Sequence, residues 1–279
     1  MRIIKGGTYT GERALYNLHG AQICDAVFCD GESPLKESSE LSLSSVRFEW
    51  KYPLWYCKQV EVKNSVLSET ARSGIWYTHG ISFIDSNIEA PKTFRRASGI
   101  SLVRTDMPNA QETLWSCSDI YIREVYARGD YFCMNCENVD VRDFKLDGNY
   151  AFDGAKNVTV ENARLMSKDA FWNTENVTVR NSVIVGEYLG WNSKNLTFIN
   201  CTIESNQGLC YIENLNLVGC TLVNTDLALE LSTVDCDIVS SVDSVKNPIS
   251  GRVRAKSIGE LIMDPEMIDP SKTEIITEE

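Results

Sequence analysis

Short segments of alternating hydrophobic and polar residues recur at a constant interval along most of the chain. In Asn176-Val-Thr-Val179 the two valines point to one side and the threonine to the other, because alternation has a period of two. No repeat contains apolar residues at helical spacing, which argues against a leucine-rich horseshoe. The chain is therefore predicted to be all-β, a single-stranded right-handed parallel β-helix. The clearest segments start 19 residues apart, at Asn138, Asn157, Asn176, Asn195 and Asn214.

The inward positions of this β-helix can be followed in both directions from the clear repeats. They predict about twelve coils of about 19 residues, with strands stacked at about 4.8 Å. Stacked asparagines at tight corners tolerate left-handed backbone conformations and can form an amide ladder. The inward pairs are Leu41/Leu43, Val60/Val62, Ile81/Phe83, Ile100/Leu102, Ile120/Ile122, Val234/Cys236 and Val253/Ala255.

One elongated domain with a cap at each end is the expected organisation, because the repeat continues without a linker. Residues 1–19 are expected to form an N-terminal strand and cap, helical over residues 10–19. Residues 20–258 are expected to form the β-helix. The proline-interrupted residues 259–279 are expected to form an irregular C-terminal tail or cap.

A third short strand in each coil is predicted to carry an aromatic outer face. Its inward column is almost entirely apolar, so the neighbouring column, which contains five of the six tryptophans, should face outward. Ala151 and Ala170 are expected on the same outer side. The outward column reads Trp55, Trp76, Arg95, Trp115, Met134, Asp153, Trp172, Trp191, Cys210 and Leu229.

Exposed tryptophans flanked by carboxylates and amides are typical of a carbohydrate groove, because each ring leaves a large apolar area in water. Three alternatives remain open. The column can be a homo-oligomer interface, it can lie under the chain's own tail, or it can be core if the alternation shifts by one residue. The predicted substrate-binding residues are Trp76, Trp115, Trp172, Trp191, Tyr131, Tyr150, Asp169, Tyr188, Asn173 and Asn192.

The charged residues on the same face supply candidate catalytic groups. Carboxylates one or two coils apart, Asp153 with Glu187 or Asp130 with Asp153, suit the separations of about 5–9.5 Å that glycoside hydrolases use. A polysaccharide lyase would instead need a cation and a base, for which Arg95 and Lys168 lie on the right face, with Asp130, Asp153 and Glu187 as possible metal ligands. Solvated surface charge is the ordinary explanation for any one of them. Whether the protein is an enzyme stays open. The alternatives are a non-catalytic carbohydrate-binding or sensing module and a structural, self-associating protein.

The composition of the chain limits the kinds of partner that the protein is expected to bind. The formal charge of −12 argues against nucleic acid and anionic membranes. With no apolar leader or span, a cytoplasmic location is expected. The ten cysteines are expected to be reduced, and two pairs of them, Cys117 with Cys136 and Cys201 with Cys220, are expected to stack one coil apart as small core residues. No cofactor and no metal site are predicted, although Ca²⁺ is compatible with the acidic face. The expected ligand is an oligosaccharide or small sugar acid, with self-association through the aromatic face as the alternative.

Several motifs resemble an uncharacterised family of bacterial right-handed β-helix proteins that share the pectin-lyase fold. The resemblance covers most of the chain and implies the fold and a bacterial cytoplasmic setting, but no catalytic residue. The motifs are Ala90-Pro-Lys-Thr-Phe-Arg-Arg96, Asn109-Ala-Gln-Glu-Thr-Leu-Trp115, Gly129-Asp-Tyr-Phe132, Asp153-Gly-Ala-Lys156, Ser167-Lys-Asp-Ala-Phe-Trp-Asn173 and Gly186-Glu-Tyr-Leu-Gly-Trp-Asn192.

Overall fold

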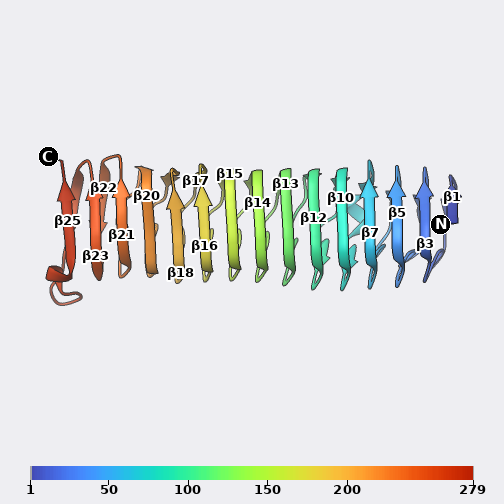
Figure 1. The fold of residues 1–279 in the computed structure, drawn as a ribbon, viewed down its shortest axis with the longest axis horizontal. Helices are drawn as coiled ribbons and strands as arrows, with labels where there is room; N and C mark the ends of the chain where they lie inside the picture. Colours follow the sequence, from blue (N-terminus) through green and yellow to red (C-terminus); the bar gives the residue numbers. More distant parts are fainter. Residues whose placement is uncertain (1, 279) are drawn as a thin grey trace. The chain divides into compact units, whose positions relative to one another are not determined.

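The computed structural model describes residues 2–278, and these divide into two compact units, residues 2–140 and 141–278. The division falls inside strand β14 (Glu137–Asp147). Both units are parallel β-solenoids, as the alternating pattern predicts. Figure 1 shows the long strands of each unit lying side by side in chain order.

In the first unit, each long strand pairs in parallel with the long strand of the next coil. Ile81 of β10, for example, lies between Val60 of β7 and Ile100 of β12. The long strands are β1 (Arg2–Lys5), β3 (His19–Cys24), β5 (Ser39–Ser44), β7 (Lys58–Lys63), β10 (His79–Ile88), β12 (Ser98–Met107) and β13 (Ser118–Arg128). The short elements are β2 (Thr8–Tyr9), β4 (Val27–Phe28), β6 (Arg47–Phe48), β8 (Val66–Leu67), η1 (Glu69–Ala71), β9 (Ile75–Trp76) and β11 (Phe94–Arg95).

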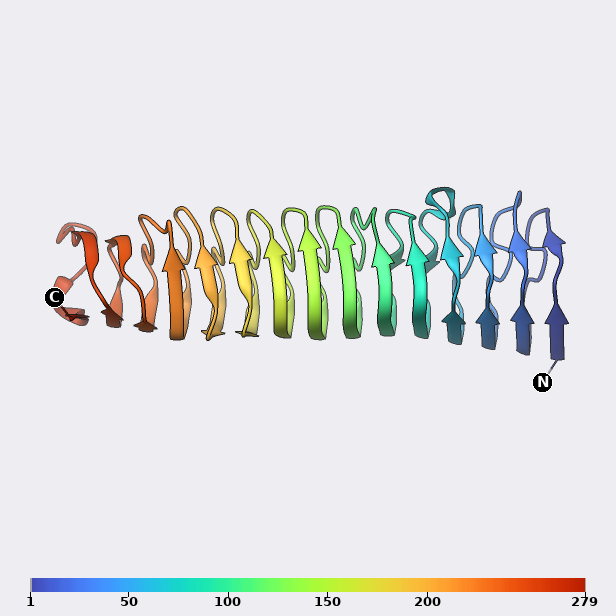
Figure 2. The same ribbon diagram turned by 90° about the horizontal axis from the view of Figure 1, so that it is seen from above.

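The second unit repeats this arrangement, with Val177 of β16 between Val158 of β15 and Leu196 of β18. Figure 2 shows the connecting turns of successive coils following the same path within each unit. The elements are β15 (Lys156–Met166), β16 (Glu175–Arg180), β17 (Val183–Val185), β18 (Lys194–Ile199), β19 (Thr202–Glu204), β20 (Glu213–Val223), β21 (Thr233–Ile238), β22 (Val242–Lys246), β23 (Ser250–Ala255), β24 (Ile258–Ile262), η2 (Pro270–Lys272) and β25 (Thr273–Thr277).

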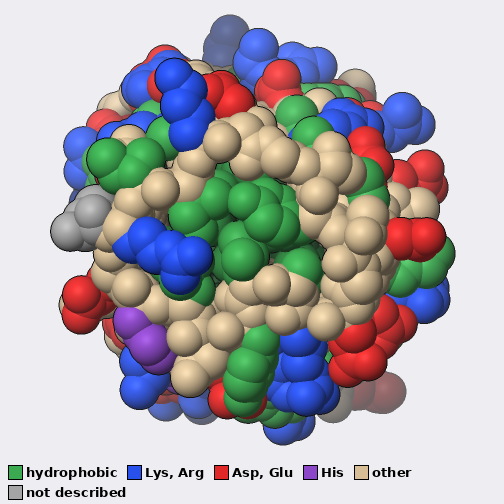
Figure 3. Space-filling model, turned by 90° about the vertical axis from the view of Figure 1, so that its right-hand side faces the viewer, with side chains coloured by type: hydrophobic (Ala, Val, Ile, Leu, Met, Phe, Trp, Pro, Cys, Tyr) green, Lys and Arg blue, Asp and Glu red, His purple; other side chains and the backbone are tan. Residues whose placement is uncertain are grey.

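The core of each unit is the space enclosed by its own coils. All the inward pairs predicted from the alternation are at most 5 % exposed. Figure 3, which looks onto the N-terminal coil of the first unit, shows hydrophobic side chains at the centre inside a ring of backbone, with the charged side chains outside. Burial of these inward columns is the main source of stability, because apolar area contributes roughly 25 cal/mol per Å² removed from water.

The coils are more numerous than the sequence indicates, about fifteen rather than about twelve, when the long strands of the described residues are counted. The N-terminal end explains part of the difference. The sequence predicts a helical cap over residues 10–19, but this segment continues a first coil whose strand β1 pairs with β3. Backbone hydrogen bonds from Arg13 and Leu15 to Glu32 and Pro34 hold this segment against the second coil. The pairing satisfies these backbone N–H groups between coils, so no helical turn is needed to supply their partners.

The C-terminal segment also extends the solenoid rather than ending it. Strand β24 pairs with β22, and β25 pairs with β23 through Gly251 to Ala255. Pro265 and Pro270 lie in the connection between β24 and β25, where Pro270 begins the three-residue η2. Prolines lack the backbone donor that a sheet needs, which accounts for their position outside the strands. Neither short 3₁₀ helix in the described residues could cross a membrane.

The predicted asparagine ladder is present along one corner of the second unit. Asn214 donates through Nδ2 to Oδ1 of Asn195 at 2.9 Å, Asn195 to Asn176 at 2.8 Å, and Asn176 to Asn157 at 3.1 Å. All four residues have a positive φ between 54° and 65°. Asparagine therefore meets two requirements at this corner, since it tolerates the left-handed conformation and supplies an amide that bonds in both directions.

Asn176→Ala is expected to lower the free energy of unfolding by about 2–3 kcal/mol. The variant loses two amide hydrogen bonds, each contributing about 1 kcal/mol, and places a side chain without local hydrogen bonding in the left-handed region. Asn176→Gly separates the two effects, because glycine removes the ladder bonds but accepts the backbone conformation. Urea denaturation of the three proteins gives the comparison, and equal stability of all three would contradict a structural role for the ladder.

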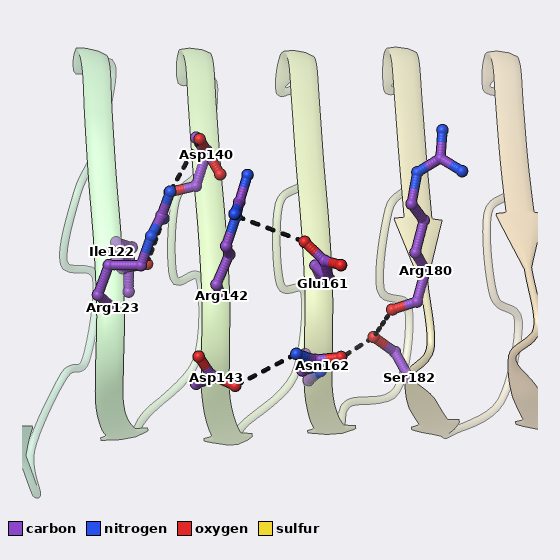
Figure 4. Close-up of polar contacts among 10 residues, drawn as sticks. Ile122, Arg123, Asp140, Arg142, Asp143, Glu161, Asn162, Arg180 and Ser182 are labelled. Carbon is purple, nitrogen blue, oxygen red and sulfur yellow. Dashed lines mark hydrogen bonds and ion pairs between the residues drawn. The ribbon is translucent and has the colours of Figure 1, made fainter.

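The outward face of the long strands is covered by ion pairs and hydrogen bonds between neighbouring coils (Figure 4). In the first unit Arg123 binds the Asp140 carboxylate at 2.9 Å, and in the second Arg142 lies 3.4 Å from Glu161. Asn162 donates to Asp143 at 3.4 Å. Exposed ion pairs contribute little stability each. This face is the solvated surface that an alternating strand requires.

The ten cysteines are free thiols. Cys117, Cys136, Cys201 and Cys220 are at most 2 % exposed, which confirms their prediction as core residues. Burial raises the pKa of the Cys57 thiol to about 12, so it stays protonated and unreactive at neutral pH.

Candidate functional site

The segment that carries the tryptophans is mostly turn rather than a third strand. Only β9 and β11 in the first unit are extended there, and each has two residues. In the second unit every other residue of the segment is left-handed, with φ of 58° at Tyr150 and 62° at Phe152. The predicted inward column is nonetheless buried, from Leu54 to Ala228.

The turn geometry changes which neighbours face outward. The alternation predicts Ala151 and Ala170 on the outside, but both are fully buried. A left-handed residue on either side of Ala151 breaks the period-two alternation, so that Ala151 and Phe152 both point inward. The tryptophans lie outside the core and are half-buried, which excludes the alternative that they are core residues. The prediction of an outward column is wrong at its last two positions, because Cys210 and Leu229 are fully buried.

In the first unit the tryptophan column forms a continuous stack. The rings of Trp55 and Trp76 are 5.2 Å apart and nearly parallel, with an interplanar angle of 8°. The Arg95 guanidinium lies between Trp76 and Trp115, 4.9 Å from the centre of each ring. Arg95 also contacts Glu112 at 3.4 Å. This predicted catalytic cation is therefore enclosed by two indoles and paired with a carboxylate.

The same unit holds two further predicted site residues. Tyr131 lies 6.1 Å from Trp115, ring centre to ring centre. The backbone N–H of Asp130 donates to Gln111 Oε1 at 3.1 Å. Because Asp130 and Asp153 belong to different units, the hypothesis that they form a catalytic pair stays a prediction.

In the second unit Trp172 and Trp191 stack at 5.8 Å with an interplanar angle of 10°. Their indole N–H groups donate to backbone carbonyls of the following coil, Trp172 to Tyr188 at 2.6 Å and Trp191 to Gln207 at 2.8 Å. Tyr150 meets Trp172 edge-on at 6.2 Å, and Tyr188 meets Trp191 at 5.3 Å. These contacts hold both indoles in one orientation, with the rings covering each other's faces.

A second amide ladder runs beside this stack. Asn192 donates to Asn173 Oδ1 at 2.8 Å, and Asn173 donates to Asp153 Oδ1 at the same distance. Asn173 and Asn192 directly follow the tryptophan position in their coils, whereas Asp153 occupies the tryptophan position of the preceding coil. An amide that uses one N–H and one lone pair in such a ladder keeps the others for a ligand. Half-buried indoles and outward amides thus lie side by side.

Lys168 and Glu187 form an ion pair at 3.2 Å next to the stack. The Glu187 carboxylate raises the pKa of Lys168, and the ammonium lies 5.2 Å from the centre of the Tyr188 ring. Lys168 is therefore protonated at neutral pH. The residue offers a positive charge to a ligand rather than a free amine base.

Asp169 is the unusual carboxyl group of this site. It lies at the position that Tyr150 and Tyr188 occupy in the coils before and after it, and it is only 2 % exposed. Burial raises its pKa, opposed by the Lys168 charge and by a hydrogen bond from Tyr150. Its Oδ1 atom is buried without a hydrogen-bond partner. A carboxyl in such surroundings favours its protonated form.

The pKa shift of Asp169 predicts how its contribution to stability varies with pH. The folded protein holds this proton to higher pH than an unfolded aspartate does. Its contribution therefore decreases as pH rises from the ordinary pKa of 3.8 through the raised value. Asp169→Asn should remove that decrease, so melting temperatures of both proteins are compared between about pH 4 and pH 7. A difference between them that does not grow with pH would contradict the assignment.

Three tyrosines outside the predicted binding set also belong to these stacks. Tyr56 and Tyr77 are parallel at 4.9 Å beside Trp55 and Trp76, and Tyr211 contacts Trp191 at 4.9 Å. Each follows the tryptophan position by one residue, in the column that carries Asn173 and Asn192. The recurrence of aromatic and amide residues in this column is the sequence signal that identifies them.

Within the described residues, no group of three histidine, cysteine or acidic side chains is placed to hold a metal ion. The site of the second unit combines a rigid indole pair, an amide ladder, an ion pair and one buried carboxyl. We call it the Trp172–Trp191 site, comprising Tyr150, Asp153, Lys168, Asp169, Trp172, Asn173, Glu187, Tyr188, Trp191 and Asn192.

Comparison with known proteins gives weak structural likenesses. The Azotobacter vinelandii mannuronan C-5 epimerase AlgE4 A-module matches with 9 % identity and a TM-score of 0.31, over 98 % of this chain and 87 % of that one. The plasmid-mediated fluoroquinolone resistance protein QnrB1, in a trypsin-treated form, matches with 14 % identity and a TM-score of 0.21, over 80 % and 91 %. Similarity at this level has no bearing on function.

No curated protein sequence matches the chain. One family profile does match, and it extends over residues 2–276, nearly the whole sequence. The chain therefore belongs to DUF3737, a family of proteins of unknown function.

Proposed function

We propose that the protein binds a carbohydrate, an oligosaccharide or uronate, at the Trp172–Trp191 site. The observation that carries this proposal is the pairing of a rigid, half-buried indole stack with the outward ladder Asp153–Asn173–Asn192. Sugars present C–H groups and hydroxyls on neighbouring surfaces. A wall that is aromatic on one side and amide-lined on the other complements both.

The stacking of the indoles defines how a sugar would lie. Trp172 and Trp191 cover each other's faces, so a ligand meets the exposed ring edges instead of stacking on each tryptophan in turn. The amides repeat at the spacing of the coils, about 4.8 Å, which is close to the length of one sugar ring. Lys168 would favour an acidic sugar through its charge, although its partner Glu187 offsets much of that attraction.

Turnover of the ligand is the alternative to binding alone, and it would use Asp169 as proton donor because of its raised pKa. Its neighbours are committed to other contacts, since Asp153 accepts from Asn173 and Lys168 pairs with Glu187. Asp169 would also need Tyr150 to move before it could reach a substrate. Binding without catalysis needs neither change, and the geometry therefore favours it over hydrolysis or elimination.

The test is a titration of the intact protein with neutral oligosaccharides and oligouronates, followed by tryptophan fluorescence and calorimetry. We expect saturable binding with a Kd between about 10 μM and 1 mM, typical of a shallow and partly solvated site. Product analysis after long incubation separates binding from turnover. Failure of every sugar to bind, together with self-association at the same concentrations, would replace the proposal by the interface alternative.

A cytoplasmic location and the lack of nucleic-acid or membrane partners remain predictions from composition. The same holds for the absence of a cofactor or Ca²⁺ requirement. The proposed aromatic face of the first unit includes Trp76, Arg95, Trp115, Asp130 and Tyr131.

A further inference from the structure

Trp50 is the sixth tryptophan, outside the tryptophan column, and it lines a hollow of about 410 Å³ in the first unit. The hollow spans three successive coils, because Trp50 follows β6, Arg72 follows η1 and Pro91 precedes β11. Its other lining residues are Lys51, Glu69 and Thr70. We call it the Trp50 hollow.

The middle coil of the three is longer than its neighbours, and the added residues form one wall of the hollow. Val60 and its partner Ile81 are 21 positions apart, whereas Ile81 and Ile100 are 19 apart. The two additional residues lie between β8 and β9, in the projecting segment that contains η1 (Figure 2). Ala71 is fully buried, and the Thr70 hydroxyl donates to a backbone carbonyl of the preceding coil at 2.5 Å. These contacts hold the added segment beside Trp50.

Trp50 is packed differently from the tryptophans of the column. It is half-buried, and the Lys51 ammonium lies 5.0 Å from its ring centre. In residues 2–278 no second aromatic ring stacks on it, and its indole N–H has no hydrogen-bond partner. Trp55, by contrast, stacks on Trp76 and donates to a backbone carbonyl. An indole is a large apolar group, so a partly exposed ring without an aromatic partner is available to a ligand.

The charged groups of the hollow include one free guanidinium. Arg72 is exposed and forms no ion pair with any described residue. The Lys51 ammonium, in contrast, lies 3.5 Å from the Glu32 carboxylate. Glu69 is the acidic residue of the lining and opposes an anion placed close to it. The lining itself therefore carries a net positive charge, in a chain whose net charge is −12.

We propose that the Trp50 hollow binds one uronate unit, a sugar ring that carries a carboxylate. The C–H face of the ring packs on the Trp50 indole and on Pro91, which is also half-buried. The carboxylate pairs with the Arg72 guanidinium, whose planar shape suits a bidentate contact. The Trp50 N–H and the Thr70 hydroxyl oxygen bond to the ring hydroxyls. All of these residues belong to the first unit, so this site is independent of the Trp172–Trp191 site.

The test follows the indole N–H resonances of the full chain by NMR while glucuronate is added at constant ionic strength. Trp50→Phe identifies the Trp50 resonance, and the resonances of Trp172 and Trp191 report separately on the other site. We expect a saturable shift of the Trp50 resonance with a Kd on the order of 1 mM, because the hollow is small and open. Glucose, which has a similar ring without the carboxylate, should bind about fivefold more weakly or less.

Arg72→Gln is expected to weaken glucuronate binding about tenfold and to leave the response to glucose unchanged, because only the uronate has a carboxylate for the guanidinium. Arg128→Gln is the matched control and should bind as the native chain does. Arg128 is an exposed arginine of the same unit, outside the hollow, and it too has no ion pair among the described residues. Glu69→Gln should strengthen glucuronate binding about twofold, because it removes a negative charge near the carboxylate. All three positions are exposed, so the variants should melt at the native temperature.

The proposal is overturned if the Trp50 resonance does not shift with glucuronate. It is also overturned if glucose binds as tightly as glucuronate, which would assign the hollow to neutral sugars. Equal weakening by Arg72→Gln and Arg128→Gln would show a general attraction between charges instead of a site. Shifts of Trp172 and Trp191 without a shift of Trp50 would support the proposed function and contradict this inference, and the reverse pattern would do the opposite.

Discussion

Phe171→Ala is expected to lower the free energy of unfolding by about 3–5 kcal/mol, which makes it the most destabilising of the proposed single substitutions. Phe171 is fully buried in the second unit. Its ring is parallel to that of Phe152 at 5.2 Å and meets Phe198 edge-on at 6.2 Å. Alanine would leave a cavity that the coils above and below cannot close without losing their hydrogen bonds. Urea denaturation measures the loss.

Trp172→Ala, one residue further along, is the matched control for Phe171→Ala. Trp172 is half-buried outside the core, so its removal should lower the free energy of unfolding by about 2 kcal/mol, from the ring contacts with Tyr150 and Trp191 and one hydrogen bond. A larger loss for Trp172→Ala than for Phe171→Ala would mean that the indoles are the true core. The m-values should be equal, because both variants unfold from the same solenoid.

Trp172→Ala combined with Trp191→Ala is expected to weaken carbohydrate binding by about 100-fold. Each indole edge contributes about 1.4 kcal/mol of contact, and the amides of Asn173 and Asn192 lose the wall beside them. The sequence alone predicts an almost unchanged melting temperature for this variant. Because the variant loses the indole stack and its two hydrogen bonds, we expect instead that its free energy of unfolding is lower by about 2–3 kcal/mol.

The control for this variant is Trp55→Ala combined with Trp76→Ala in the first unit. That pair has the same parallel stacking, but Tyr56 and Tyr77 take the place of the amides. Stability should decrease by a similar amount while binding at the Trp172–Trp191 site stays unchanged. Calorimetry is the appropriate measurement, because both variants remove fluorophores. Equal loss of binding in the two variants would point to a general loss of structure.

Some features of the site could not be predicted from alternation. The period-two pattern correctly places Phe171 inside and Trp172 outside, yet it misplaces Ala170. The reason is the left-handed backbone at Asp169 and Phe171, with φ of 58° and 57°, which a period-two pattern does not encode. Asp169 is buried for the same reason. Because aspartate is common on protein surfaces, its presence at this one position does not indicate burial.

The sequence by itself determined the coil, its inward columns and the amide ladder, because burial and corner geometry impose the same residue types every 19 positions. The ends were misjudged, since a coil that lacks the repeat's asparagines is still held by backbone pairing, as β1 is by β3. Only the tertiary structure decided what each outward residue contacts. Three such contacts are the packing of Arg95 between two indoles, the stacking of Trp172 on Trp191 and the burial of Asp169. They depend on the direction in which each side chain leaves its coil. That direction follows from the left-handed turns and not from the spacing of the repeats.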